Sequence, residues 1–131
     1  MARKGVTTAA VVEAAARLAD ADGLERLTLA RLAAELRIQP SSLFNHIAGL
    51  AELRRHLQLR GLREMAARTA RAGVGRAGED AVLAVAVALR QFAREHPGLY
   101  AASLPATPTQ DPELNAIAQE FVGIFFDTMR R

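Results

Sequence analysis

The apolar residues of this chain recur every three or four positions, which is the spacing of helices that bury one face. The first such stretch covers residues 8–21, and Gly23 follows it as a residue that can close a helix in a left-handed conformation. A second, two-turn helix is expected after Thr28, which is a good N-cap. A third is expected from Gln39, with Pro40 in its first turn, where a missing N–H costs nothing.

The rest of the chain continues the same pattern. A long helix is expected from Leu50 to about Ala72, followed by a glycine-rich linker over residues 72–78. A strongly apolar helix is predicted over residues 79–95, with acidic residues in its first turn, and a short helix can follow in residues 99–106. Asp111 caps a last helix that runs to the chain end. The predicted fold class is all-α: an N-terminal three-helix bundle joined by a long helix to a C-terminal helical domain.

Residues 28–47 have the organisation of a helix-turn-helix, with a tight turn at Arg37 and Ile38. Leu43 and Ile47 are the inward positions of its second helix. The outward side chains can donate and accept at base edges in a major groove, and they are Gln39, Ser41, Ser42, Asn45 and His46. The groups that can bind flanking phosphates are Arg3, Lys4, Thr28, Arg37, His46 and an arginine early in the long helix, Arg54 or Arg55.

The net charge of +3 is unevenly distributed along the 131 residues. Residues 1–76 hold 13 Lys/Arg and 7 Asp/Glu, whereas residues 77–131 hold 4 and 7. A basic N-terminal part is typical of a nucleic-acid partner and also of arginine-rich helix surfaces. The chain has no cysteine and only three scattered histidines, so we expect no metal and no cofactor. No secretion signal or membrane span is apparent, and a cytoplasmic location is expected.

Four motifs in order resemble the DNA-binding domain of the tetracycline-repressor (TetR) family. They are AA-x-x-L at 14–18, DGL at 22–24, LT-x-x-x-LAAEL at 27–36 and SLFNHI at 42–47. The resemblance covers residues 7–57, and HPGLY at 96–100 extends it into the ligand-binding half of one branch of that family.

The resemblance implies an all-α homodimer, most often a repressor, that binds a palindromic DNA operator and is released by a small apolar effector. Residues 1–50 would bind DNA, and residues 51–131 would bind the effector and dimerise. Residues 39–46, including Pro40 and Phe44, would form the recognition helix, and Thr28 and His46 would contact phosphates.

The chain also departs from the family pattern. Arg37 stands where glycine is usual, Gln39 where Ser or Thr caps the helix, Phe44 where the aromatic carries a hydroxyl, and Leu50 where Lys is common. Family members usually continue with two more helices that build the dimer interface. We therefore expect either a truncated chain, which would expose the apolar side of residues 114–129, or a dimer that uses the faces that remain.

An effector pocket is expected to draw on Met65, Phe92, Tyr100, Leu104, Phe121 and Phe125, although aromatics at helical spacing are also ordinary core residues. An enzyme is not predicted, because the chain shows no nucleophile–base pair with supporting context and GVGRAG at 73–78 follows no strand. The alternative hypothesis is a helical small-molecule-binding or protein-interaction module whose DNA-binding part does not function.

Overall fold

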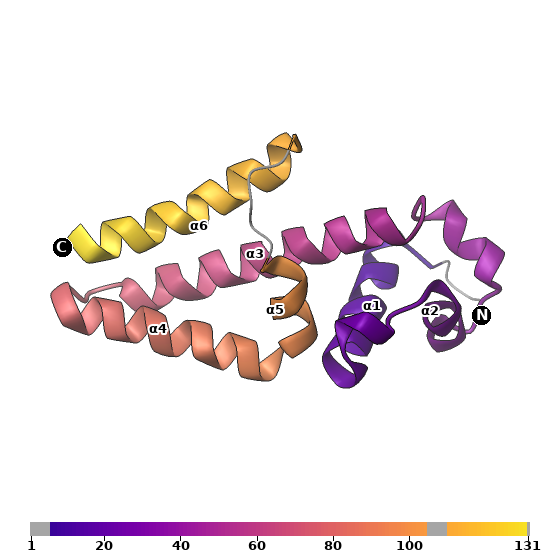
Figure 1. Cartoon of the computed structure of the whole chain (residues 1–131), viewed down its shortest axis with the longest axis horizontal. Coiled ribbons are helices and arrows are strands. Elements are labelled where there is room, and N and C mark those ends of the chain that lie inside the picture. The colour runs from indigo at the N-terminus through magenta and orange to yellow at the C-terminus, as the bar shows by residue number, and fades with distance from the viewer. Residues whose placement is uncertain (1–5, 105–109, 131) are drawn as a thin grey trace.

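The computed structural model describes residues 6–104 and 110–130, which form an elongated arrangement of helices (Figure 1). No strand occurs within these two ranges, which confirms the predicted all-α class. In chain order the elements are α1 (Thr8–Asp22), the 3-10 helix η1 (Leu24–Arg26), α2 (Leu29–Leu36), the 3-10 helix η2 (Pro40–Asn45), α3 (Leu50–Gly73), α4 (Gly78–Glu95), α5 (Pro97–Ser103) and α6 (Pro112–Arg130).

Short polar side chains begin several of the helices. The backbone N–H of Arg31 donates to Thr28 Oγ1 over 3.1 Å, so Thr28 is the N-cap of α2 as predicted. Asp111 Oδ1 accepts from the N–H groups of Glu113 and Leu114 at the start of α6, as also predicted. At the other end of α1, Gly23 has a φ of 99°, and its N–H bonds to the Ala19 carbonyl. These three boundaries are therefore set by residues next to them in the sequence.

Two expectations about local structure need correction. The segment from Pro40 to Asn45 is a 3-10 helix rather than an α-helix, because its N–H groups bond three residues back, as from Ser42 to Gln39. This tighter coil suits so short a segment. The expected linker over residues 72–78 is only a four-residue turn, 74–77, because α3 continues through Gly73 and α4 begins at Gly78. Gly73 is buried beside α6, and Gly75 with a φ of 72° supplies the turn.

One hydrophobic core runs through the molecule, and α3 extends along most of its length. Near the N-terminal end the core holds Leu32, Leu43 and Ile47, and along α3 it holds Leu53, Leu57 and Leu62. In Figure 1, α4 and α6 run along the far half of α3, and the two helices pack against α3 and against each other, whereas α5 packs against both α3 and α1. The DNA-reading segments predicted from the sequence therefore lie together at one end of a long molecule.

Both α4 and α6 also expose apolar side chains. On α4, Ala81, Val85 and Phe92 are buried, whereas Leu83 and Val87 are 65% and 49% exposed. On α6, the exposed residues Val122, Phe126 and Met129 form a stripe at helical spacing. Within the described residues, no helix is long and apolar enough to cross a membrane.

Candidate nucleic-acid interface

The candidate interface is built on η2, whose inner side is anchored in the core. Leu43 and Ile47 are 0% and 2% exposed, and they belong to the same buried cluster as Leu32 and Ala33 of α2. A hydrogen bond from Thr8 Oγ1 to the His46 carbonyl, 3.1 Å long, joins the end of η2 to α1. Because the inner side is held in this way, the outer side of η2 keeps one orientation.

The turn between α2 and η2 passes through Arg37 in a left-handed conformation, with φ 59° and ψ 42°. The N–H of Ile38 bonds to the Ala33 carbonyl and the N–H of Arg37 to the Ala34 carbonyl, which is the hydrogen-bond pattern of a Schellman motif. Glycine normally occupies that position, since a Cβ is unfavourable there. The turn predicted at Arg37 is therefore present, with the strain that the departure from glycine implies.

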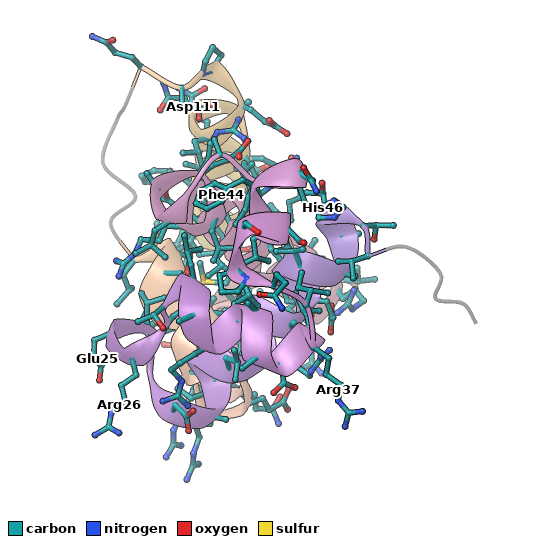
Figure 2. All side chains as sticks on the ribbon, turned by 90° about the vertical axis from the view of Figure 1, so that its right-hand side faces the viewer. Glu25, Arg26, Arg37, Phe44, His46 and Asp111 are labelled. Atoms are coloured by element: carbon teal, nitrogen blue, oxygen red, sulfur yellow. The ribbon has the colours of Figure 1, made fainter. Side chains whose placement is uncertain are left out.

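The outer face of η2 is solvent-exposed and chemically mixed. Gln39, Pro40, Ser41 and Asn45 are exposed, Ser42 and His46 are half-buried, and the Phe44 ring is 57% exposed. Figure 2 looks onto this end of the molecule, where Arg37, Phe44 and His46 lie with Arg37 directed outward. The amides of Gln39 and Asn45 offer both donors and acceptors, and Phe44 offers an apolar surface. These groups match the chemistry of base edges in the major groove.

The exposed cations around η2 differ in whether they are already paired. Within the described residues Arg37 and Arg54 have no ion-pair partner, whereas Arg55 is held by two carboxylates of the α6 start. Arg55 Nη2 lies 3.2 Å from Asp111 Oδ1 and 2.8 Å from Glu113 Oε1. Of the two arginines proposed for phosphate contact, Arg54 is therefore the available one.

The remaining candidates for phosphate contact are Thr28, Arg3 and Lys4. Thr28 is exposed, and although its oxygen caps α2, its hydroxyl hydrogen stays available to a phosphate oxygen. Arg3 and Lys4 lie outside the described residues.

Hydrogen bonding from Arg55 lowers the pKa of Asp111 to about 2 and also lowers the pKa of Glu113. Arg63 Nη2 adds a second bond to Glu113, 2.6 Å long. These carboxylates stay ionised at neutral pH, and they join the start of α6 to the part of α3 nearest the candidate interface. This cluster could not be predicted from the sequence, because its acidic and basic members lie about fifty residues apart.

The six residues predicted for an effector pocket range from buried to exposed. Met65 and Phe92 are buried in the core, with Phe92 between the Tyr100 ring, 6.3 Å away edge-on, and the Arg68 guanidinium, 5.3 Å from its centroid. Tyr100 and Phe121 are half-buried against the same core. Phe125 packs edge-on against Phe121 at 6.2 Å, and Leu104 is 56% exposed. The pocket stays a prediction.

The segment from α2 to η2 is a helix-turn-helix at one end of an all-helical chain, and this arrangement is typical of the helix-turn-helix class of DNA-binding regulators. The family of tetracyclin repressor-like C-terminal domains matches residues 82–131. An uncharacterized HTH-type transcriptional regulator of Bacillus subtilis (strain 168), YobS, is 40% identical over 102 residues, which cover 78% of this chain and 53% of the relative. Another from Mycobacterium tuberculosis (strain H37Rv) is 40% identical over 92 residues, which cover 70% of this chain and 42% of the relative.

A solved structure shows the same fold. The crystal structure of a possible TetR family transcriptional regulator from Streptomyces coelicolor A3(2) matches with a TM-score of 0.64 at 23% identity, over 94% of this chain and 62% of that one. The chain is therefore similar to TetR-family regulators in the sequence of residues 82–131 and in its fold. It spans about half the length of the curated relatives that it matches.

Proposed function

We propose that this chain is a sequence-specific DNA-binding transcriptional regulator that reads the major groove with the outer face of η2. The observation that carries the proposal is the two-sided character of η2. Its inner side is buried to within 2% at Leu43 and Ile47, whereas its outer side presents Ser41, Phe44 and Asn45 to solvent. An anchored inner side with hydrogen-bonding groups and an apolar ring on the outer side is the arrangement that reading base edges requires.

The proposal assigns a role to each exposed group. Asn45 can pair with an adenine through its amide, and Phe44 can contact a thymine methyl group. Thr28, Arg37, His46 and Arg54 would bind the flanking phosphates. Residues 1–50 would thus be the DNA-binding domain, and the target would place the protein in the cytoplasm.

We further propose that residues 51–131 bind a small apolar effector and form a homodimer, and that the protein is a repressor released by that effector. The exposed apolar residues Leu83 and Val87 of α4 and Phe126 of α6 support a surface that a second copy would cover. Two copies are needed to read the two halves of a palindromic operator.

The test begins with selection of duplexes from a random library, followed by affinity measurements over a salt series. We expect enrichment of one palindromic sequence and an affinity that falls steeply with salt, because bound phosphates release counterions. Asn45→Ala should relax the preference at one base pair by about 1–3 kcal/mol. The control Gln110→Ala, at an exposed position before α6, should change neither quantity.

Two outcomes would contradict the proposal. A protein that enriches no sequence, or binds every duplex equally with a flat salt response, would favour the interaction-module alternative. A strictly monomeric mass in gel filtration would exclude the homodimer.

A further inference from the structure

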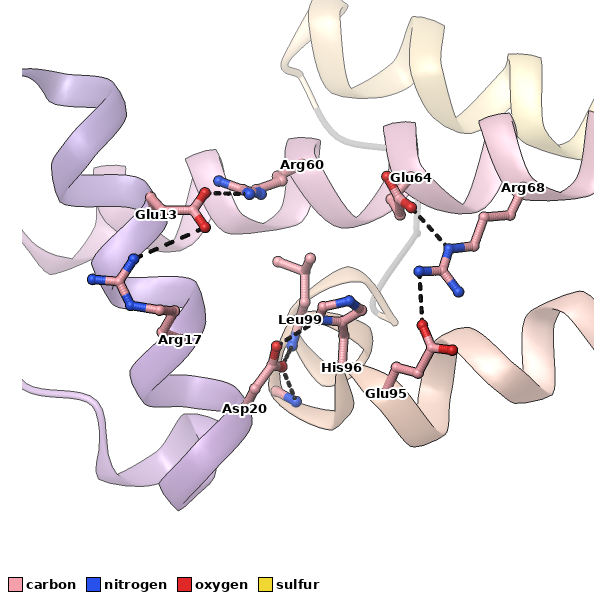
Figure 3. A network of polar contacts seen from close by, with 10 residues as sticks. Glu13, Arg17, Asp20, Arg60, Glu64, Arg68, Glu95, His96 and Leu99 are labelled. Atoms are coloured by element: carbon pink, nitrogen blue, oxygen red, sulfur yellow. Dashed lines mark hydrogen bonds and ion pairs between the residues drawn. The ribbon is translucent and has the colours of Figure 1, made fainter.

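The helix α5 lies between the DNA-reading end and the rest of the molecule, and a residue of α1 completes its first turn. We use "head" for the segment from α1 to η2 and "body" for α4 to α6. Asp20 of α1 accepts hydrogen bonds through Oδ1 from the N–H groups of Gly98, 2.9 Å away, and Leu99, 3.0 Å away. Its other oxygen pairs with His96 Nδ1 at 2.7 Å (Figure 3). One carboxylate of the head thus holds three groups of the body.

This α1–α5 joint replaces the usual local cap of a helix. His96, the residue at the N-cap position of α5, gives no side-chain hydrogen bond to the helix that follows. The first N–H groups of a helix need an acceptor, and a carboxylate is the strongest one available. The side chain of Asp20 is only 18% exposed, so water competes weakly for these bonds. The joint is therefore specific to one placement of α5 on α1.

The close packing of α5 on both sides makes the joint intolerant of small shifts. A Cβ added at Gly98 would lie 2.2 Å from the backbone of Ala19, so the backbones of α5 and α1 are in contact there with no side chain between them. On the opposite side, a Cβ at Gly61 of α3 would lie 2.9 Å from the Leu99 carbonyl oxygen. Any movement of α5 toward α1 or α3 therefore meets backbone, and movement away from α1 breaks the bonds to Asp20.

We propose that Asp20 is a positioning residue that fixes the orientation of the head relative to the body through α5. The inference rests on the proposed DNA-binding function, which it extends to the way the head is held. Asp20 lies on the α5 side of α1, where both of its carboxylate oxygens are engaged by residues 96–99. Its contribution to operator affinity comes from holding η2 at one angle, and a change in the body that displaces α5 must first release this carboxylate.

The orientation can be measured directly because the chain contains no cysteine. Spin labels on cysteines introduced at Ala34 of α2 and Arg90 of α4, both exposed, report the head-to-body distance by pulsed electron resonance. We expect a narrow distance distribution in the parent chain and a broader one in Asp20→Ala. Asp20→Asn keeps an acceptor oxygen for the two N–H groups and should restore the narrow distribution.

Two further variants serve as a control and as an alternative to Asp20→Ala in the distance measurement. Glu13→Ala removes an exposed side chain of the same helix that pairs with Arg17 and Arg60 but not with α5, and it should leave the distribution unchanged. If Asp20→Ala does not fold, Asp20→Glu retains the charge and moves the carboxylate past the two N–H groups, which should shift or broaden the distribution. An unchanged distribution in the alanine and glutamate variants would overturn the proposal.

Operator affinity provides the second readout. In Asp20→Ala we expect it to fall by about tenfold, within the usual range of coupling between sites, and to recover in Asp20→Asn. Unchanged affinity despite a broadened distribution would also overturn the proposal. If the parent chain selects no duplex, the proposed function fails, whereas the distance measurement still decides whether Asp20 holds the head.

Discussion

Arg37 allows one prediction to be worked out in detail, because its backbone strain and its proposed role in DNA binding act in opposite directions. Its φ of 59° lies in the region that costs a residue with a Cβ about 1–2 kcal/mol. Replacement by glycine removes that cost but adds back about 0.5–1 kcal/mol of unfolded-state entropy. The Arg37 side chain is exposed and has no ion-pair partner among the described residues, so no folded-state contact is lost.

Arg37→Gly should therefore raise the free energy of unfolding by up to about 1.5 kcal/mol, with a central value of about 0.75 kcal/mol. The melting temperature should rise by about 2–4 °C for a chain of this size. Urea unfolding with an unchanged m-value measures the first quantity, and calorimetry measures the second. The same variant should bind the operator more weakly and lower the slope of log affinity against log salt by about one, since one phosphate contact is lost.

Arg54→Ala is the matched control, because it removes an exposed, unpaired arginine from a helix without changing strain. It should lower the salt slope by a similar amount and leave stability nearly unchanged. A glycine variant that is less stable than the parent would refute the strain argument. A glycine variant with an unchanged salt slope would remove Arg37 from the phosphate contacts.

Further predictions concern the joint and the acidic cluster. Gly98→Ala should destabilise the fold by about 2–3 kcal/mol in urea unfolding, because the added Cβ would meet the Ala19 backbone. Gly123→Ala is the control: its added Cβ would have no atom within 4 Å, so the variant should be neutral or stabilise the fold by up to about 1 kcal/mol. Equal effects of the two would contradict the packing described for α5. The pKa of Asp111 is lowered to about 2 by Arg55, so its contribution to stability is complete above about pH 4 and is lost as pH falls toward 2. Asp111→Asn keeps the cap but not the charge, and acid titration of its unfolding should show a smaller loss over that range.

The parts of the fold that could be predicted from sequence are those set by neighbouring residues. Local spacing and side-chain chemistry predict the caps at Thr28 and Asp111, the inward positions Leu43 and Ile47 and the turn at Arg37. The helix type of η2 was missed, since apolar spacing over six residues does not separate a 3-10 coil from an α-helix.

The contacts that join distant segments could not be predicted. By sequence pattern Arg54 and Arg55 are equivalent surface arginines, and only the position of the α6 start shows that Arg55 is occupied. Likewise Asp20 looks like an ordinary polar residue near a helix end, and its partners lie 76 to 79 residues further along the chain. Such pairings depend on tertiary placement, which no local signal carries.

The separation of the two sides of the α1–α5 joint along the chain has a consequence for folding. The helices α1, α2 and η2 and the first turns of α3 are contiguous, so their contacts close short loops and can form while the chain is still being synthesised. The carboxylate of Asp20 has no partner from α5 until residues 96–99 have emerged and docked. We therefore expect the DNA-reading end to acquire its own structure before its orientation is set, with the docking of α5 as a late step.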